Sequence, residues 1–364
     1  MLLSKIITTI ENIAPAAYQE SYDNAGLVTG HGNMEISGIL VCLDVTLPVI
    51  DEAIRINANL IVSHHPVIFS PLKKITGSSV TEKIVIRAIQ NNIALYSAHT
   101  NLDNVITGVN KIICDKLGLV NTRILVPRSN ILRKLVTFVP FSHTDTVRRA
   151  LFNAGAGQIG KYDSCSYNLE GKGTFRAGED ASPFTGEIGE LHFENETRIE
   201  TIFPIHLKNN IVKALLDVHP YEEVAFDIYP VENDLNTVGS GMIGELENEK
   251  AEEALLADIK KKFNCKVVRY SKLRIKPIKK VAVCGGSGSF LIRDAIRAGA
   301  DLFLTGEIKY HQFFDAGDQI VVADIGHFES EQFTIHLIYD ILIKNFPNFA
   351  IRFSQINTSP IYYL

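Results

Sequence analysis

The stretch Leu60-Ile61-Val62-Ser63-His64-His65 decides the fold class, because a short apolar run leads directly into two adjacent histidines. A run of this kind is typical of a strand buried in a sheet. Two other short β-type runs end in the same way, one before His99-Thr100-Asn101-Leu102-Asp103 and one before Gly326-His327-Phe328-Glu329-Ser330-Glu331. Ligands of α/β sheets bind where the strands end. The sequence therefore predicts an α/β protein in which three strand ends bring imidazoles and carboxylates together.

The spacing of these side chains favours two metal ions over one. Adjacent side chains such as those of His64 and His65 diverge, so two neighbouring ions accommodate them better than one. His327 and Glu331 are four residues apart and would share one face of a helix, where a carboxylate can bridge two ions. Nitrogen and oxygen ligands without thiolate suit zinc, manganese, iron or cobalt. Two ions about 3.5–4 Å apart can activate a water molecule near neutral pH. For any single motif, the alternative is a strand-end histidine that makes only local hydrogen bonds.

Length and composition exclude several classes of protein. At 364 residues the chain is long for one hydrophobic core, so we expect two domains. Its 46% hydrophobic and 21% charged residues are typical of a folded globular protein, and its net charge of −5 disfavours a general nucleic-acid binder. Five scattered cysteines without a CxxC pair predict buried free thiols in a reducing compartment. Without a basic leader or an apolar stretch of about 20 residues, the expected location is the cytoplasm.

The chain contains an internal repeat at an offset of 242 residues. Ile39-Leu40-Val41-Cys42 aligns with Val281-Ala282-Val283-Cys284, and His64-His65 then falls on Gly306-Glu307. Both copies have the pattern strand, helix, strand and polar turn. The repeat predicts two related αβ half-domains that share one site. Chance similarity between two βαβ units is the alternative.

Residues 129–233 differ in character from the segments on either side. The pattern predicts strands at 135–139, 199–203 and 224–229, helices at 144–154 and 208–217, and short strands with a loop in the Gly-rich stretch 155–190. This is the order of a split βαβ, ferredoxin-like domain, and it contains none of the three histidine motifs. We therefore predict an α/β metal-binding domain of residues 1–128 and 234–364, with residues 129–233 as an inserted α+β domain.

Further candidate site residues lie in the second half. The turn Gly285-Gly286-Ser287-Gly288 follows a predicted strand, and its backbone N–H groups can hold a phosphate; a tight turn without a ligand is an equal alternative. Glu307 and His311 are candidates for a general acid or base, or for partners that orient the metal ligands, and the start of a surface helix is the alternative. Every charged residue from Lys260 to Lys280 is basic, so this stretch either attracts a polyphosphate or forms a solvated face.

Taken together, these motifs resemble those of the Nif-like dinuclear-metal hexamer family, whose members often carry the name GTP cyclohydrolase 1 type 2 homologue. The matching segments are Tyr22-Asp23-Asn24-Ala25-Gly26-Leu27, Ser63-His64-His65-Pro66, His99-Thr100-Asn101-Leu102-Asp103, Gly285-Gly286-Ser287-Gly288, Thr305-Gly306-Glu307 with His311, and Gly326-His327-Phe328-Glu329-Ser330-Glu331. The resemblance implies two divalent metal ions per chain, with Glu331 bridging them. The implied ligands are His64, His65, Asp103, His327 and Glu331.

The same resemblance implies a quaternary structure and a type of insert. The expected assembly is a toroidal homohexamer whose sites face an internal cavity. The insert resembles the PII-like or CutA-like domain of longer family members through His219-Pro220-Tyr221-Glu222-Glu223. Domains of that type tend to form trimers, which is compatible with a hexamer built as a dimer of trimers.

Three functional hypotheses follow. The leading one is a metal-dependent hydrolase of the GTP cyclohydrolase kind, which would convert GTP and water to 7,8-dihydroneopterin triphosphate and formate; the substrate comes from the resemblance rather than from the residues. The second is a two-metal phosphoesterase acting on nucleotides. The third is a non-catalytic metal-binding or regulatory hexamer whose insert senses a small molecule. The expected partners are copies of the chain and a nucleotide or another small phosphorylated ligand, with no membrane and no nucleic acid.

Overall fold

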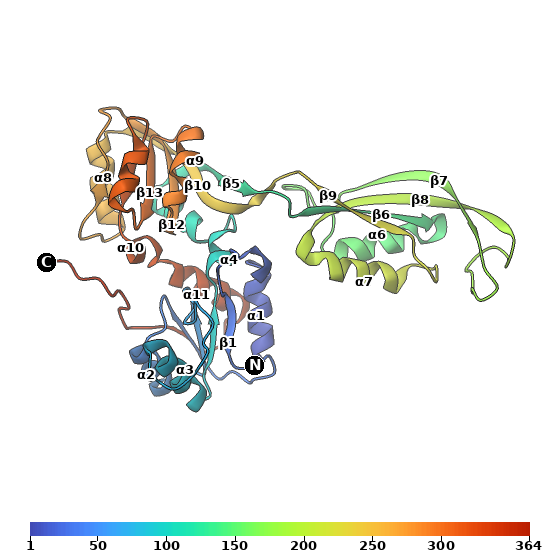
Figure 1. Ribbon diagram of the computed structural model, residues 1–364, viewed down its shortest axis with the longest axis horizontal. Coiled ribbons are helices and arrows are strands. Elements are labelled where there is room, and N and C mark those ends of the chain that lie inside the picture. The colour runs from blue at the N-terminus through green and yellow to red at the C-terminus, as the bar shows by residue number, and fades with distance from the viewer. The chain divides into compact units, whose positions relative to one another are not determined.

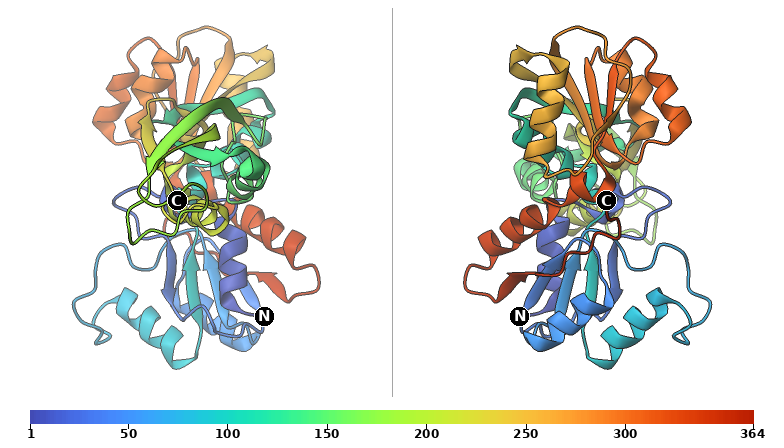
Figure 2. Two further views of the ribbon diagram at one scale, coloured as in Figure 1. Left: turned by 90° about the vertical axis from the view of Figure 1, so that its right-hand side faces the viewer. Right: turned by 90° about the vertical axis from the view of Figure 1, so that its left-hand side faces the viewer.

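Three β-sheets and the helices packed on them build a mixed α/β fold (Figures 1 and 2). The computed structural model describes all residues from Met1 to Leu364. It divides the chain into two compact units, one formed by Met1–Val126 with Thr237–Leu364 and the other by Pro127–Asn236. No helix in either unit combines the length and apolar character needed to cross a membrane.

The first sheet of the larger unit has five strands in the order β1-β4-β3-β2-β15. Its parallel centre consists of β2 (Ile39–Cys42), β3 (Leu60–Ser63) and β4 (Ala94–Ser97), and every residue of these strands is buried. Continuous apolar runs suit them because helices cover both faces of a parallel sheet. The edges are β1 (Gly26–Thr29), antiparallel to β4, and β15 (Ile351–Phe353), parallel to β2. The helices associated with this sheet are α1 (Leu3–Glu11), α2 (Leu47–Arg55), α3 (Val80–Gln90) and α11 (Thr334–Asn345).

The second sheet of this unit has six strands in the order β11-β14-β13-β12-β10-β5. Its parallel centre repeats that of the first sheet in order and register, since Ile39 lies opposite Leu60 in one sheet and Val281 opposite Leu302 in the other. Residues that are 242 positions apart in the sequence therefore occupy equivalent pairing positions in the two sheets. The strands are β5 (Leu119–Arg128), β10 (Leu235–Lys250), β11 (Arg269–Tyr270), β12 (Ile278–Ser287), β13 (Leu302–Gly306) and β14 (Val321–Asp324).

Helices pack on both faces of this sheet. One hydrophobic core joins the sheet to α5 (Val109–Leu117) and α8 (Glu252–Lys262), and a second joins it to α9 (Ile292–Arg297) and η5 (Tyr310–Ala316). Two short helices directly follow parallel strands of the two sheets and carry proposed metal ligands. They are α4 (Thr100–Asp103) and α10 (His327–Glu331). The remaining short 3-10 helices are η1 (Ala16–Tyr18), η2 (Phe141–His143), η3 (Ile205–Leu207) and η4 (Ser289–Leu291).

The smaller unit is a four-stranded antiparallel sheet with two helices on one face. Its chain order is β-α-β-β-α-β and its strand order is β7-β8-β6-β9, which is the arrangement of a ferredoxin-like sheet. The elements are β6 (Leu132–Pro140), α6 (Thr144–Asn153), β7 (Ser166–Arg176), β8 (Leu191–Pro204), α7 (Lys208–Val218) and β9 (Phe226–Val231).

The hairpin of β7 and β8 differs from the sequence expectation of short strands between residues 155 and 190. The two strands pair without a break from Ser166 opposite Thr201 to Arg176 opposite Leu191. Most of β7 is exposed, so its sequence lacks the apolar alternation that marks a strand with one buried face. Pairing with β8, rather than burial of side chains, therefore holds most of this strand in place.

Candidate metal centre

The carboxyl ends of the parallel strands open into one cavity of about 670 Å³ in the larger unit. Strand β3 leads into His64 and His65, β4 leads into His99 and the helix that ends at Asp103, and β14 leads into the helix that carries His327 and Glu331. The lining therefore draws on both halves of the repeat. This is the edge of an α/β sheet at which ligands normally bind.

One group of donor atoms consists of His64, Asp103 and Glu331. His64 Nε2 lies 3.6 Å from Asp103 Oδ1 and 3.7 Å from Glu331 Oε1, beyond hydrogen-bond distance. Both His64 Nε2 and Asp103 Oδ1 are buried without a hydrogen-bond partner. Buried polar atoms are rarely left unpaired. Such a gap between a nitrogen and two carboxylate oxygens suits a cation, since divalent metals bind these atoms at about 2.0–2.2 Å.

A second group consists of His65, His327 and Glu331. Glu331 Oε2 lies 2.9 Å from His65 Nε2 and 2.9 Å from His327 Nε2, and the two nitrogens are 3.3 Å apart. The two oxygens of Glu331 thus face different groups, Oε1 the first and Oε2 the second. Glu331 therefore occupies the position expected of a carboxylate that bridges two ions. Only 3% of its side chain is exposed.

Three hydrogen-bond or ion-pair partners aim the histidine Nε2 atoms into the cavity. His64 Nδ1 donates to the carbonyl oxygen of Ala98 at 2.8 Å, and His65 Nδ1 donates to Asp44 Oδ1 at 2.7 Å. His327 Nδ1 lies 3.2 Å from Glu307 Oε2. Partners of this kind hold a ligating histidine in the right tautomer and orientation. Glu307, a predicted catalytic candidate, lines the cavity and contacts a predicted ligand from its far side.

The protonation equilibria of the cluster are strongly shifted. Burial opposes the charge on Glu331, but hydrogen bonds from His327 and His65 and the nearby His64 hold its pKa well below the usual value. Burial, reinforced by the charge of Glu331, raises the pKa of Asp103 well above its usual value. The pKa of His64 is lowered, chiefly by burial.

The two other histidines shift in the opposite direction. Burial lowers the pKa of His65, but hydrogen bonds to Asp44 and Glu331 outweigh it and raise the value to about 10. The pKa of His327 is likewise raised to about 9, against the effect of burial, by its hydrogen bond with Glu331. Protons therefore occupy these two imidazoles near neutral pH in the metal-free protein.

His99 and Asp23 form a pair that was absent from the residues predicted to be catalytic. Asp23 Oδ1 accepts a hydrogen bond from His99 Nδ1 at 2.7 Å, and the other oxygen of Asp23 accepts from Thr100. Burial opposes the charge of Asp23, but the bonds from His99 and Thr100 lower its pKa to about 2. His99 also groups with His64 and His65, with donor atoms within 4.8 Å of one another. A histidine oriented by a carboxylate at the edge of a metal site is suited to carry protons.

The glycine turn predicted to hold phosphate lies beside the centre, but three of its four N–H groups already have side-chain acceptors. Gly285 N donates to Asn110 Oδ1, Gly286 N to Ser330 Oγ, and Gly288 N to Thr305 Oγ1, at 2.9–3.0 Å. These donors are not free to cradle a phosphate. Gly286 instead leaves room for Glu331, because a Cβ atom there would overlap the Oε1 atom of Glu331.

We expect Gly286→Ala to lower metal affinity at least about tenfold, because the new methyl group displaces Glu331. A left-handed backbone (φ +62°) would add about 1–2 kcal/mol of strain. Gly118→Ala is the matched control, since Gly118 also has positive φ (+77°) but open space around it. Elemental analysis and thermal melts of both variants separate the two effects. Equal metal content in Gly286→Ala and Gly118→Ala would contradict the prediction.

His311 and the basic stretch lie outside the cavity lining. His311 is exposed in η5, where its ring contacts Tyr310 and Phe314. None of the basic residues between Lys260 and Lys280 lines the cavity, and Arg269 is paired with Asp324. The lining contains no Lys or Arg at all. The chain itself therefore supplies no side-chain cation, apart from histidine, to a ligand in this cavity.

Comparisons with known proteins agree over nearly the whole chain. A family model described as Duf34/NIF3 (NGG1p interacting factor 3) matches residues 1–360. A protein of Halalkalibacterium halodurans named GTP cyclohydrolase 1 type 2 homolog is 42% identical over 324 residues, which are 88% of this chain and 87% of the relative. A Bacillus subtilis protein of the same name is 40% identical over 326 residues, 89% and 87% of the two chains. The crystal structure of a Bacillus cereus protein related to NIF3 has a TM-score of 0.86 and 37% identity, and the match covers 100% of this chain and 99% of that one.

Proposed function

Because the chain belongs to the Duf34/NIF3 family, we propose that it is a hydrolase that works with two divalent metal ions. The position of Glu331 carries the proposal, since its two oxygens face two separate groups of donor atoms. His64 and Asp103 would hold one ion, His65 and His327 would hold the other, and Glu331 would contribute to both. Zinc, manganese, iron and cobalt all accept such a mixture of imidazole and carboxylate ligands.

The ions, when bound, supply an activated water and polarise the bond that is hydrolysed. The protein's own residues orient the ligands and move protons. Asp44 orients His65 through the Nδ1 atom of that histidine, and Glu307 orients His327 in the same way. Asp23, ionised at neutral pH, keeps the proton of His99 on Nδ1, so the other ring nitrogen is left to exchange a proton with the substrate.

His99→Gln is expected to lower kcat by about 10²–10⁴, the range typical for loss of a general acid or base. Metal content should stay unchanged, because His99 acts on the substrate in this proposal and not on an ion. Turnover and metal-to-protein ratio are measured on the same preparation. Loss of metal from His99→Gln would show instead that His99 is a ligand.

The specific form that we propose is hydrolysis of the GTP cyclohydrolase kind, supported by the names of the relatives. It is tested by incubating the metal-loaded protein with GTP. Formation of formate with the triphosphate retained supports this reaction. A pure, metal-loaded protein that turns over no nucleotide would contradict it and favour the non-catalytic, regulatory alternative.

The absence of Lys and Arg from the cavity lining favours phosphoester hydrolysis as a second candidate. A triphosphate needs cations, and within one chain the ions at the centre would be the main ones available. A phosphoryl group would then compete with the guanine ring for the ions. Release of phosphate or GMP in the same incubation, without formate, distinguishes this reaction from the first.

We also propose that the protein acts as a toroidal homohexamer in the cytoplasm and that its insert is a PII-like or CutA-like domain. The hexamer follows from the motifs that resemble the dinuclear-metal hexamer family, and the β-α-β-β-α-β order supports the type of insert. All five cysteines are free, which suits a reducing compartment. Neighbouring subunits of a hexamer could also provide the cations that the cavity lacks. Native mass spectrometry tests the assembly.

A further inference from the structure

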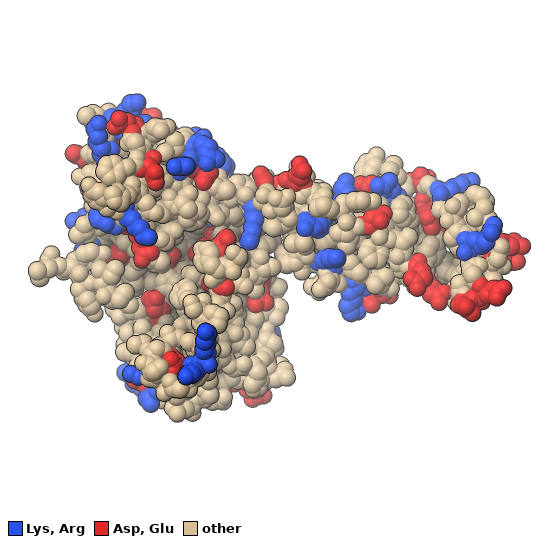
Figure 3. Space-filling model, in the orientation of Figure 1, with Lys and Arg blue, Asp and Glu red and all other residues tan.

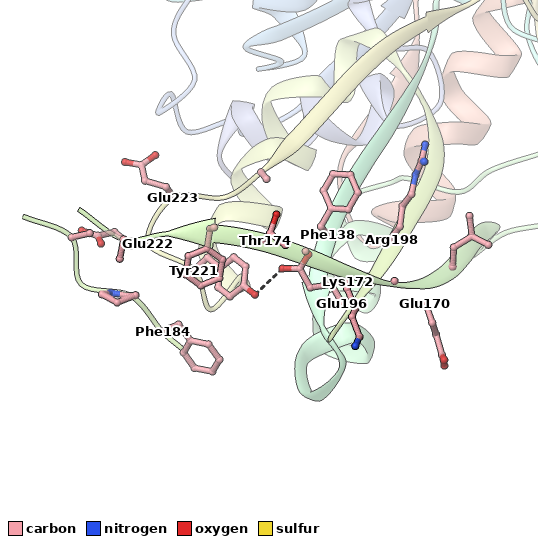
Figure 4. A pocket seen from close by; sticks show the side chains of 18 residues that line it. Phe138, Glu170, Lys172, Thr174, Phe184, Glu196, Arg198, Tyr221, Glu222 and Glu223 are labelled. Atoms are coloured by element: carbon pink, nitrogen blue, oxygen red, sulfur yellow. Dashed lines mark hydrogen bonds between the residues drawn. The ribbon is translucent and has the colours of Figure 1, made fainter. Parts of the chain in front are cut away.

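The insert contains a second cavity, of about 600 Å³, on the side of its sheet opposite the helices (Figure 4). The hydrophobic core uses Leu135 on β6 and Ile199 on β8, which point toward α6 and α7. By the alternation of strands, Phe138 and Glu196 face the other way. Phe175 lies opposite His192 in the ladder and therefore shares the face of Glu196. The cavity is of the size that binds small organic molecules.

Glu196 is a buried carboxylate at the floor of this cavity. Only 8% of the residue is exposed, and its Oε1 atom accepts a hydrogen bond from the hydroxyl of Tyr221 at 2.8 Å (Figure 4). The other oxygen lies over Gly173, where a side chain would overlap it. Glu196 has no ion-pair partner, because the nearby Arg198 pairs with Glu200 at 2.8 Å. Burying a carboxylate without a cation is costly.

Aromatic rings from separate segments surround the carboxylate. The ring of Tyr221, which follows α7, lies 6.1 Å from Phe175 of β7 and 6.2 Å from Phe184 of the β7–β8 loop. Phe138 of β6 lines the same space. The backbone N–H of Ser182 donates to Glu222 at 2.8 Å and so joins the β7–β8 loop to the segment that carries Tyr221. Ring faces attract cations as well as apolar groups.

The surroundings of the cavity are acidic. Residues 177–190, which connect β7 to β8, contain four acidic residues and no Lys or Arg. Acidic side chains gather at this end of the insert in Figure 3. The lining itself contains Glu170, Glu222 and Glu223 besides Glu196, against two cations, Lys172 and Arg198, of which Arg198 is paired with Glu200. This field would concentrate cations and repel phosphates.

We propose that the insert cavity binds an organic ammonium ion with an apolar body. The ammonium group lies against the free oxygen of Glu196, and the body packs between Phe138, Phe175 and Tyr221. Such a ligand satisfies the two unusual features of the cavity together: the buried, unpaired carboxylate and the rings around it. The site is independent of the metal centre and of the reaction proposed for it.

The test compares two probes of the same shape on the full-length, metal-loaded protein. 1-Naphthylmethylamine is a cation at neutral pH, and 1-naphthalenemethanol is its neutral analogue. The protein contains no Trp, so the naphthalene fluorescence anisotropy reports binding without interference from indole. We expect the amine to bind at least about tenfold more tightly than the alcohol, the discrimination typical of a charged hydrogen bond.

Glu196→Gln should abolish this preference while leaving the affinity for the alcohol and the metal content unchanged. Glu194→Gln is the matched control, because Glu194 lies two residues away on the same strand but does not line the cavity. Equal affinity for both probes, or a preference that survives Glu196→Gln, would overturn the proposal. Failure of the wild-type protein to bind either probe would also overturn it, as expected if another copy of the chain covers this face. If Glu196→Gln does not fold, the comparison of the two probes on the wild-type protein decides.

Discussion

Replacing Glu331 by Gln is expected to strip metal from the protein, with a loss of affinity greater than the roughly 10–100-fold typical of residues that only orient ligands. Both candidate ligand groups include this carboxylate, whose Oε1 atom faces His64 and whose Oε2 atom faces His65 and His327. Gln has the same size but lacks the charge and one acceptor oxygen. Elemental analysis should show the loss of at least one ion per chain, while circular dichroism shows an unchanged fold.

The same variant has a second readout in the metal-free state. Glu331 contributes to the raised pKa values of His65 and His327, so both values should fall toward that of an ordinary histidine in Glu331→Gln. Titration of the imidazole NMR signals measures this change. Glu329→Gln is the control, since Glu329 lies on the same helix and does not line the cavity. Full metal retention by Glu331→Gln would disprove the bridging role.

Strands that are buried on both faces could be predicted from the sequence because burial demands apolar residues at every position. Strand β2 and the matching residues 281–284 of β12 have this character, and the offset of 242 residues between them carries over into the register of the two sheets. The hairpin of β7 and β8 could not be predicted in the same way. Its strands are stabilised by backbone pairing while most of β7 faces solvent, so its side chains carry little periodic signal.

The partners of the histidines were harder to predict than the histidines themselves. His65 directly follows a strand, so a few neighbouring residues are enough to recognise it as a candidate ligand. Its contact with Asp44 joins the ends of two different strands and cannot be recognised from neighbouring residues. One signal was available, because Asp44 follows β2 almost directly, at the edge of the sheet where the histidines lie. Asp23 lay within a motif shared with the resembled family, but only the folded chain brings it to His99.

The glycine turn shows a different limit of sequence reasoning. A strand followed by Gly285-Gly286-Ser287-Gly288 looks the same whether its N–H groups are free or not. In the structure the acceptors are Asn110, Thr305 and Ser330, which come from three separate elements. Only tertiary contacts could show that the donors are already used.

Metal affinity is expected to rise by roughly 100-fold per pH unit between about pH 6 and 8, because two protonated imidazoles must each release a proton when the ions bind. The pKa values of about 10 for His65 and about 9 for His327 lie above this range, so both carry protons throughout it in the metal-free protein. Protons and metal compete for the same Nε2 atoms, which is why acid weakens binding and alkali strengthens it. Histidines with ordinary pKa values would already be neutral above about pH 7, and the affinity would then level off there.

Competition with a chelator at a series of pH values measures this slope, and calorimetry in buffers of different ionisation enthalpy counts the protons released. Asp44→Asn provides an internal check, because Asp44 is one of the groups that raise the pKa of His65. In that variant the affinity should begin to level off at a lower pH. Proton release near zero at pH 7 would contradict this prediction, because it would mean that His65 and His327 are already deprotonated at pH 7 in the metal-free protein.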